Sequence, residues 1–269
     1  MRAPVVRSVL TAIAAAMSLL VVACTGEADT LAAGTSVVPQ PEGTTPAAPT
    51  TTSAGTVTGA TQPYPFGQAQ AKVPPIAGGK APVIRHIATD KPYVFITMDD
   101  GAVRDPQALQ LIRDSGARPT LFLNDRYVKG HEDYFKQLQD TDQLVIGNHT
   151  VNHPDLKKLS YAAQKKEICD NSDAFQKAFG QRPTLFRPPF GNYNDDTLRA
   201  VADCGLKAVV LWTAAVNDGV VQFQANGKLK PGDIVLMHFR KTFVQDYTAF
   251  LNRAKQDGLT PVPLSDFLA

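Results

Sequence analysis

The chain has 269 residues, a formal net charge of +2 and 43% hydrophobic residues. This length and composition suffice for one full-sized domain and a remainder. The charge is nearly balanced and the sequence has no dense basic run, so it gives no sign of a nucleic-acid partner.

The first 23 residues have the pattern of an export signal. Arg2 and Arg7 flank a short positive start, and the apolar run SVLTAIAAAMSLLVVA follows. At about 15 residues, this run is short for a membrane span, which needs about 20. The run ends in LVVAC, where small Ala23 before Cys24 resembles the lipobox of bacterial lipoproteins. This resemblance implies a signal peptide over 1–23, a lipid on Cys24 and a location outside the cytoplasm at the bacterial cell membrane. The alternative is a cleaved secretory signal with an incidental cysteine.

Residues 24–80 consist mainly of Thr, Pro, Ala, Gly and Ser, with almost no apolar periodicity. Such a segment cannot bury enough apolar surface to offset its ordering entropy, which predicts a disordered linker. A flexible coil of about 55 residues spans roughly 40 Å and would tether the domain away from the membrane. Tyr64 and Phe66 are expected not to pack on the domain.

The chain has three cysteines, an odd count that needs an explanation in an exported protein. If Cys24 carries a lipid, Cys169 and Cys204 remain as a pair in an oxidising compartment. A bridge between them would close a loop of about 35 residues, worth about 3–4 kcal/mol. The alternative is two buried free thiols on neighbouring helices.

From residue 81 to residue 269, strands and helices alternate. Strands are expected over 93–98, 120–123, 143–146, 184–186, 207–212, 233–238 and 260–264, from short apolar runs. The first helix is expected after Asp105 as N-cap, with Pro106 at its first position and Gly116 past its end. Further helices are expected over 132–138, from Ser160 to about 179, over 195–204 before Gly205, and around 247–256. The alternation predicts a mainly parallel sheet, and about seven units come close to closing a barrel.

The unusual polar residues follow the expected strands instead of being scattered. In chain order they are Asp99, Asp100, His149, His153, Arg187, Asp218 and His238. The carboxyl ends of the strands in a parallel barrel lie on one face, where active sites are built. The sequence therefore predicts a single site at this face.

The residue types in this set indicate metal-dependent hydrolysis. His149 and His153 are four residues apart, a spacing that lets two imidazoles point the same way on a helical turn. With one carboxylate they give a two-His, one-Asp site with open positions, as a hydrolytic zinc site needs. Residue 150 is Thr, so the site is not the metalloprotease H-E-x-x-H. The second carboxylate beside the ligand could serve as a general base.

His238 could then act as the general acid, oriented by an acidic partner such as Asp218. Five motifs in the sequence resemble, in order, those of the NodB-homology polysaccharide deacetylases, carbohydrate esterase family 4: TMDDG, HTVNHP, RPPFG, WTAAVND and LMH. The resemblance covers about residues 85 to 269. It implies a distorted (β/α) barrel and a metal-dependent hydrolase that removes acetyl groups from N-acetylated or O-acetylated polysaccharides.

The resemblance also implies a role for each matching residue. Asp99 would be the catalytic base, Asp100, His149 and His153 would bind the metal, usually zinc, and Arg187 would pair with Asp99 and keep it ionised. Asp218 would orient His238, which protonates the departing amine. The N–H of Phe190 would help to stabilise the oxyanion, a contribution of about 3 kcal/mol per donor, and Leu236 would line the slot for the acetyl methyl.

Three positions depart from the family pattern. Met98 stands where phenylalanine is common, and Phe239 stands where an acid is frequent. Gly219 replaces the tryptophan that often follows the acid of the fourth motif and helps to wall the acetyl pocket. Trp212 could wall the pocket instead, and the alternative for this residue is core packing.

Together these features predict a lipid-anchored, zinc-dependent polysaccharide deacetylase that acts as a monomer on the N-acetyl sugars of peptidoglycan or chitin-like oligomers. Two alternatives are an O-acetyl (xylan) esterase with the same mechanism and a wall-glycan-binding protein with reduced activity. A third is a mononuclear iron oxygenase, which shares the two-His, one-carboxylate set. That alternative predicts a β-rich scaffold and does not explain the second Asp or Arg187.

Overall fold

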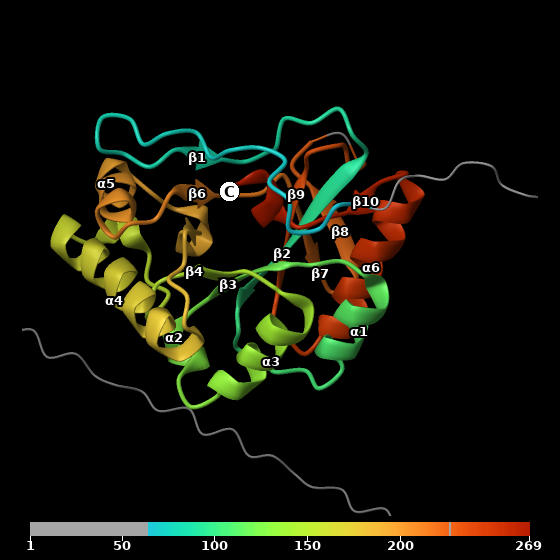
Figure 1. The fold of residues 1–269 in the computed structure, drawn as a ribbon, viewed down its shortest axis with the longest axis horizontal. Helices are drawn as coiled ribbons and strands as arrows, with labels where there is room; N and C mark the ends of the chain where they lie inside the picture. The colour runs from blue at the N-terminus through green and yellow to red at the C-terminus, as the bar shows by residue number, and fades with distance from the viewer. Residues whose placement is uncertain (1–63, 226) are drawn as a thin grey trace, which may run out of the picture. The chain divides into compact units, whose positions relative to one another are not determined.

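Buried apolar strands form a ten-stranded sheet in the computed structural model, which describes residues 64–225 and 227–269 (Figure 1). The strands run in the order β1–β6–β5–β4–β3–β2–β9–β7–β8, and β10 pairs with the start of β2. All of these pairs are parallel except β7–β8, which is antiparallel. The predicted signal peptide, Cys24 and the linker up to residue 63 lie outside the described residues.

The strands are β1 (Val83–Ile84), β2 (Tyr93–Asp100), β3 (Thr120–Leu123), β4 (Ile146–Asn148), β5 (Leu185–Phe186), β6 (Ala208–Val210), β7 (Ala214–Asn217), β8 (Val220–Phe223), β9 (Ile234–His238) and β10 (Thr260–Pro261). The α-helices are α1 (Ala108–Ser115), α2 (Asp125–Val128), α3 (Glu132–Asp142), α4 (Tyr161–Phe179), α5 (Asp195–Asp203) and α6 (Phe243–Gln256). Short 3₁₀ helices are η1 (Leu156–Lys158), η2 (Pro189–Gly191) and η3 (Leu264–Phe267). This arrangement confirms the predicted distorted (β/α) barrel. Three strands, β1, β7 and β8, were not predicted.

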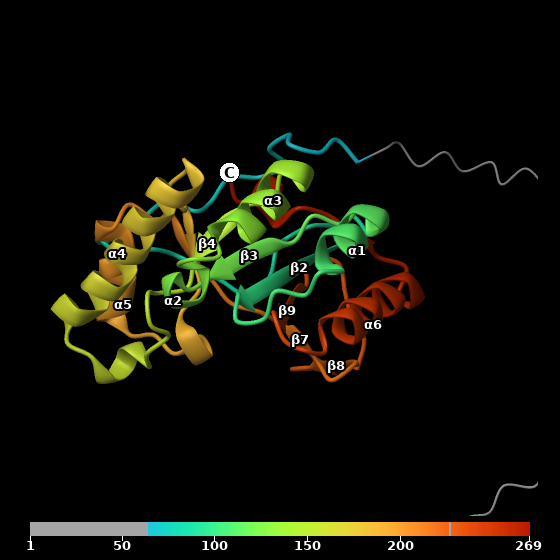
Figure 2. The ribbon, with the colours of Figure 1, turned by 90° about the horizontal axis from the view of Figure 1, so that it is seen from below.

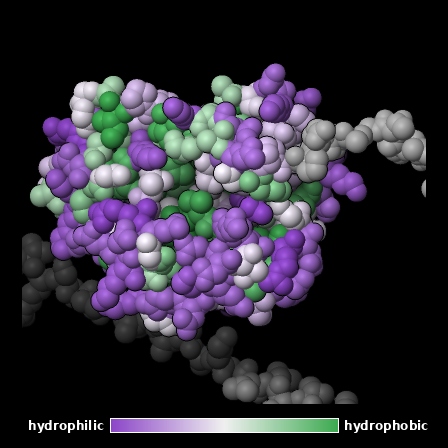
Figure 3. Space-filling model, in the orientation of Figure 1, coloured by the Kyte–Doolittle hydropathy of each residue, from purple (hydrophilic) through white to green (hydrophobic). Residues whose placement is uncertain are grey.

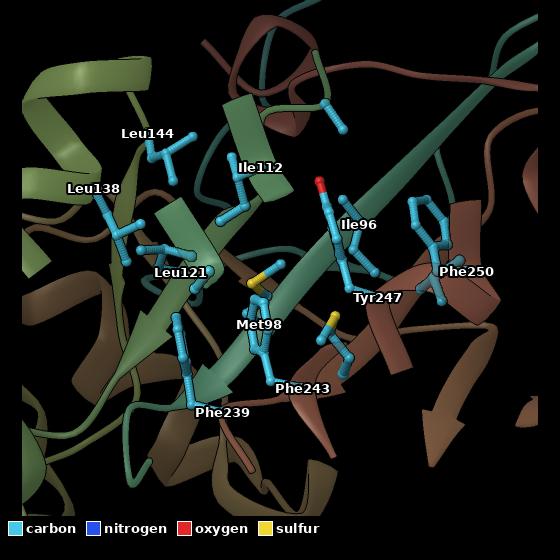
Figure 4. Packing of buried hydrophobic residues seen from close by; sticks show 14 of the residues in the cluster. Ile96, Met98, Ile112, Leu121, Leu138, Leu144, Phe239, Phe243, Tyr247 and Phe250 are labelled. Carbon is cyan, nitrogen blue, oxygen red and sulfur yellow. The ribbon is translucent and has the colours of Figure 1, made fainter. Parts of the chain in front are cut away.

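Strand β2 separates two apolar layers because successive side chains of a strand point to opposite faces. Ile96 and Met98 face outward and pack with Ile112 of α1 and with Phe243 and Tyr247 of α6 (Figure 4). The intervening residues of β2 face the barrel interior and lead to Asp99. Figure 2 shows α1 and α6 near one end of the sheet and α4 and α5 near the other, with β2 and β3 between them.

Several predicted element boundaries were shifted: β10 ends at Pro261 instead of residue 264, and α6 begins at Phe243, four residues earlier than expected. Two further shifts have a local cause. Strand β4 begins at Ile146 instead of residue 143, because Gln143 adopts a left-handed conformation with φ 54° and ends α3. Helix α1 begins at Ala108, two residues later than expected. Asp105 caps a turn before the helix, where its Oδ1 accepts a hydrogen bond of 2.8 Å from the Gln107 N–H.

The expected loop after the fifth strand instead contains the β7–β8 hairpin. Its turn residues Asp218 and Gly219 have φ values of 50° and 74°. Two successive positive φ values are typical of a type I′ turn, for which Asp-Gly is a favoured pair. The Asp-Gly pair in AAVNDGVVQF was therefore a hairpin signal that the sequence analysis missed.

The segment 64–80, called the N-terminal strap here, packs on the domain. The Tyr64 hydroxyl donates a hydrogen bond of 2.9 Å to Asp266, and its ring lies edge-on to Tyr93 at 5.3 Å. The guanidinium of Arg118 stacks over Phe66 at 4.1 Å. The prediction that Tyr64 and Phe66 do not pack was therefore wrong: Tyr64, with Val73, packs against a buried apolar cluster, and Phe66 contacts Arg118 while staying 40% exposed. The folded part begins before residue 81.

A disulfide joins Cys169 on α4 to Cys204, which follows α5. Their Cα atoms lie 5.0 Å apart, within the range that a disulfide spans. The predicted bridge is confirmed, and it ties together the two helices that lie side by side in Figure 1.

Hydrophilic residues dominate the lower part of the surface in Figure 3, over α2 and α3. Within the described part of the chain, none of the helices combines the length and the apolar character that crossing a membrane requires.

Candidate active site

The two adjacent acids at the end of β2 reach the same imidazole. Neighbouring strand residues normally point to opposite faces. Asp100, however, has a left-handed backbone with φ 75°, which breaks this alternation. As a result, Oδ2 of Asp99 lies 3.6 Å and Oδ1 of Asp100 lies 3.5 Å from Nε2 of His149. Gly101, with φ 87°, then turns the chain out of the strand.

His149 and His153 lie in the loop after β4, at the carboxyl end of the strand as predicted. Their rings converge through a loop conformation and not through a helical turn, so that part of the prediction was wrong. Thr150 and His153 both have positive φ values, 71° and 59°. The loop is held internally, because Thr150 Oγ1 accepts a hydrogen bond of 3.0 Å from the His153 N–H. The two rings lie edge-on with their centroids 4.9 Å apart.

Asp100, His149 and His153 fit a divalent metal ion. Oδ1 of Asp100 lies 3.5 Å from Nε2 of each histidine, and it is buried without a hydrogen-bond partner in the described part of the chain. Ligand atoms bound tetrahedrally to zinc at about 2.0–2.1 Å lie about 3.3–3.4 Å apart. The three side chains are therefore spaced as metal ligands and not as a hydrogen-bonded cluster.

The protonation state of His149 also suits a ligand. Its Nδ1 donates a hydrogen bond of 2.7 Å to the Arg187 carbonyl, which leaves a lone pair on Nε2. Burial lowers the pKa of His149 to about 3, so the imidazole is neutral at physiological pH.

Arg187 and Asp99 form the predicted ion pair in the fully buried interior of the barrel. Nη1 of Arg187 donates hydrogen bonds of 2.7 Å to Asp99 Oδ1 and 2.7 Å to Thr97 Oγ1. Its remaining donors reach the carbonyls of Val210 and Leu211, and the guanidinium stacks over Phe122 at 4.4 Å. Burial raises the pKa of Asp99, and the charge of Arg187 opposes that rise.

Sequence reasoning missed three supporting residues. Thr97, the second acceptor for Arg187, lies two residues before Asp99, so the period of a strand could have revealed it. The Asn124 amide donates to the carbonyls of His149 and Thr150. Asn148 Oδ1 accepts a hydrogen bond of 2.9 Å from the Thr150 N–H. Single asparagines at strand ends give no local signal of this kind.

His238 ends β9 and lies opposite Asp99 in the strand register. Its Nδ1 is buried without a hydrogen-bond partner among the described residues. Burial lowers the pKa of His238 to about 4, against the opposing charge of Asp99.

The structure does not bring Asp218 to His238. Asp218 is exposed in the β7–β8 turn, where its carbonyl accepts a hydrogen bond of 3.1 Å from Gln245. The hairpin carries the carboxylate past the end of β7, so the predicted pairing is absent. Gly219 is required here, because a Cβ at its φ of 74° would lie 2.5 Å from the Gln245 amide nitrogen. A tryptophan at this position would displace Gln245.

The predicted substrate-contacting residues surround the centre. Phe190 is 65% exposed and lies edge-on to His153, with 4.7 Å between ring centroids. Trp212 is half-buried and stands beside Gly191, where a Cβ would come within 3.1 Å of its ring. Leu236 is buried on β9, two residues before His238. The assignment of these three residues to substrate contact stays a prediction.

Backbone strain is concentrated at this centre. Of the six non-glycine residues with positive φ in the described ranges, four belong to it: Asp100, Thr150, His153 and Phe190. Each such conformation costs about 1–3 kcal/mol and persists only where the surroundings impose it, which occurs mostly at functional sites.

Comparison with known proteins places the same region in a family. The profile of the family described as Polysaccharide deacetylase matches residues 86–209. The peptidoglycan-N-acetylglucosamine deacetylase of Bacillus cereus is 30% identical over 196 residues, which cover 68% of this chain and 91% of that protein. The uncharacterized protein SCO4760 of Streptomyces coelicolor is 43% identical over 156 residues, which cover 57% of this chain and 62% of that relative. The matched region thus spans less than two thirds of SCO4760.

Among solved structures, BA3943 of Bacillus anthracis, described as a CE4 family pseudoenzyme, superposes with a TM-score of 0.60. The match is 21% identical and covers 70% of this chain and 69% of that chain. At this identity the likeness shows a shared fold.

Proposed function

Because the chain belongs to the polysaccharide deacetylase family, we propose that it is a metal-dependent hydrolase that removes acetyl groups from N-acetylated cell-wall polysaccharide. The observation that carries this proposal is the convergence of Asp100, His149 and His153, with the Asp99–Arg187 pair beside them. The similarity to a protein named as a peptidoglycan-N-acetylglucosamine deacetylase supports peptidoglycan or chitin-like oligomers as the substrate class.

Asp100, His149 and His153 would hold the metal, and two imidazoles with one carboxylate suit Zn²⁺. When bound, such an ion polarises a carbonyl and acidifies water at the site. The hydrogen bond from His149 to the Arg187 carbonyl fixes the ring with Nε2 toward the centre.

Asp99 is the proposed base. Its buried carboxylate lies beside the ligand cluster, and its raised pKa makes it a better proton acceptor than an exposed aspartate. Arg187 holds one of its oxygens at 2.7 Å, which leaves the other to take a proton from the attacking water. As that water oxygen bonds to the acetyl carbon, the carbon–nitrogen bond breaks and acetate is released.

His238 is the proposed acid that gives a proton to the leaving nitrogen. It stands next to Asp99 across the β2–β9 pair. Its pKa of about 4 makes His238 a stronger acid than an exposed histidine but leaves less of it protonated at neutral pH. The Phe190 N–H is assigned to the oxyanion and Leu236 to the acetyl methyl.

The direct test is acetate release by the purified full chain from acetylated chito-oligomers and acetylated xylan, with chelator and with added zinc. Zinc-dependent release from the chito-oligomers is the expected result. Release from xylan alone would identify an O-acetyl esterase and overturn the N-acetyl assignment.

A second candidate is a glycan-binding protein with reduced turnover. The observation that favours it is the buried Nδ1 of His238, which has no partner in the described part of the chain. BA3943, which shares the fold, is described as a pseudoenzyme. Binding of chito-oligomers with zinc bound and without acetate release would support this candidate against the first.

We also propose that the protein is anchored outside the cytoplasm through a lipid on Cys24, on the strength of the LVVAC sequence at the end of the apolar run. In cells fed a labelled fatty acid, the wild-type chain should take up label and a Cys24→Ser chain should not. Equal labelling of both would overturn the anchor.

A further inference from the structure

The face of the sheet that carries His238 continues onto the β7–β8 hairpin. Leu236 of β9 pairs with Ala215 of β7, and Ala215 pairs with Gln222 of β8. In the next row, Asn217 pairs with Val220. Directly paired residues share a face of a sheet, so these side chains lie on the side of the sheet that Leu236 shares with His238.

The opposite side of the hairpin faces the hydrophobic core. There Ala214 and Val216 are buried, and Val221 and Phe223 pack against the same cluster. The side toward His238 is open, because Gln222 is exposed and Val220 is 58% exposed. An uncovered surface of the hairpin therefore adjoins the candidate active site.

Arg240 stands at the edge of this surface, two residues after His238. It is exposed, and its Nη1 donates a hydrogen bond of 2.8 Å to Asn217 Oδ1. Asn217 in turn donates a hydrogen bond of 3.1 Å to Gln222 Oε1. This chain of hydrogen bonds fixes the direction of the guanidinium on the rim.

The charge of Arg240 is not neutralised within residues 64–225 and 227–269. Four other arginines form ion pairs there, namely Arg182, Arg187, Arg199 and Arg253, whereas Arg240 forms none. A guanidinium has five N–H donors in a planar fork, and the Asn217 contact uses only one of them.

Arg240 also lies within electrostatic range of the centre. Burial lowers the pKa of His238, and Arg240 lowers it further. Arg240 follows His238 by two residues and is held to the hairpin by Asn217, so an anion bound by Arg240 would lie at the rim of the candidate site.

We propose that Arg240, positioned by Asn217, binds a carboxylate of the substrate glycan on the β7–β8 surface. A planar fork with free donors matches a carboxylate bidentately, and the exposed Val220 side chain offers an apolar contact to a sugar ring. This inference rests on the proposed function and narrows its substrate class. The site prefers glycans whose N-acetyl sugars stand beside a carboxylate, as lactyl-bearing sugars of peptidoglycan do, over neutral chitin-like oligomers.

The test is calorimetric binding of two probes to the zinc-loaded full chain. One probe is chitotetraose, which is neutral, and the other is a peptide-free peptidoglycan tetrasaccharide, in which every second sugar carries a lactyl carboxylate. We expect the acidic probe to bind about fivefold more tightly at low salt, which is the upper range for an exposed ion pair, and the ratio to shrink as salt is added.

In Arg240→Gln the affinity ratio should fall to about one, and Arg240→Lys should restore part of it. Lys241→Gln is the matched control, because it removes an adjacent exposed cation and should keep the wild-type ratio. Zinc content is measured for each variant, and the affinity ratio of the two probes is compared only between zinc-loaded proteins. A wild-type ratio of one, or a ratio that survives in Arg240→Gln, would overturn the proposal.

Acetate release separates this inference from the proposed function. If neither probe releases acetate but the ratio depends on Arg240, the carboxylate site stands and the deacetylase assignment fails. If acetate is released and binding shows no preference, the deacetylase assignment stands and the carboxylate site fails.

Discussion

The candidate site has two sides that are built differently. On the side of β2, β4 and β5, Asp99, His149 and Arg187 each form hydrogen bonds with neighbours that are themselves buried. On the side of β9 and the β7–β8 hairpin, His238 has a buried Nδ1 without a partner in the described chain, and Asp218 lies in the solvent. The side that would bind the metal and hold the base is thus tightly constrained. The side that would supply the proton and contact the rest of the glycan is held by fewer buried hydrogen bonds.

The largest expected effect comes from removing a ligand on the constrained side. His149→Ala should lose metal and, with it, all measurable acetate release, because two ligands remain of three. Metal content by atomic emission and acetate release are the measurements. His131→Ala serves as the control, because His131 is exposed at the start of α3. This variant should keep its metal and its acetate release. Full metal content in His149→Ala would contradict the ligand assignment.

Asp99→Asn separates the base from the metal ligand. We expect turnover to fall by about 10²–10⁴-fold, the usual contribution of a general base, while zinc content stays at the wild-type level. The variant also leaves Arg187 buried without its counter-charge, a defect that typically costs about 3–5 kcal/mol in the free energy of unfolding. Activity is therefore measured at a temperature where circular dichroism shows folded protein. Loss of zinc in this variant would mean that the roles of the two acids are reversed.

Ala215→Asp tests whether the open side can be completed. Ala215 pairs with Leu236 and so shares the face of His238, where a carboxylate could accept the Nδ1 proton. A nearby negative charge raises the pKa of a histidine, here from about 4. As the proposed acid, His238 would act in its protonated form, so activity should decline as pH rises through this pKa. The variant should move that decline to higher pH.

At pH 7 the expected gain in turnover for Ala215→Asp is about tenfold, for a pKa that rises by about one unit. Ala215→Asn has the same size without the charge and should leave the pH profile in place. An unshifted profile in Ala215→Asp would show that residue 215 does not reach His238.

The smallest effect is expected for Asp218→Asn. The Asp218 side chain is exposed and has no bond to His238, and Asn-Gly also suits a type I′ turn. Acetate release should change by less than about twofold, within the range for a surface substitution. A drop of tenfold or more would return Asp218 to the role of partner of His238.

The parts of the fold that the sequence predicts well are those where local pattern and burial agree. Residues 120–123 form β3 as expected because all four are buried in a parallel sheet and therefore read as one apolar run. Ser160 begins α4 as expected because its hydroxyl accepts a hydrogen bond from the Ala163 N–H. Asp99 and Asp100 end β2 as predicted, and Arg187 pairs with Asp99.

The failures occur where a single residue redirects the chain. Gln143 in a left-handed conformation delays β4, and the Asp218–Gly219 turn makes a hairpin out of an expected loop. The second failure also removes Asp218 from the site. The position of the Asp218 side chain relative to His238 could not be predicted from sequence spacing alone, because it depends on the register of β7 against β9. The packing of Tyr64 and Phe66 was missed because the average composition of their segment is polar.

The N-terminal strap brings the two ends of the described domain together. Tyr64 is bonded to Asp266, and the Val73 N–H donates to the carbonyl of Ala269 at 3.5 Å. Ends that meet in this way allow circular permutation, in which a short linker joins 269 to 64 and new termini are opened elsewhere. An opening next to residue 224, 225, 227 or 228, all of which are exposed, would leave the β7–β8 hairpin and β9 unbroken. The order in which the chain is synthesised could therefore be changed without altering the strand ends that carry the site.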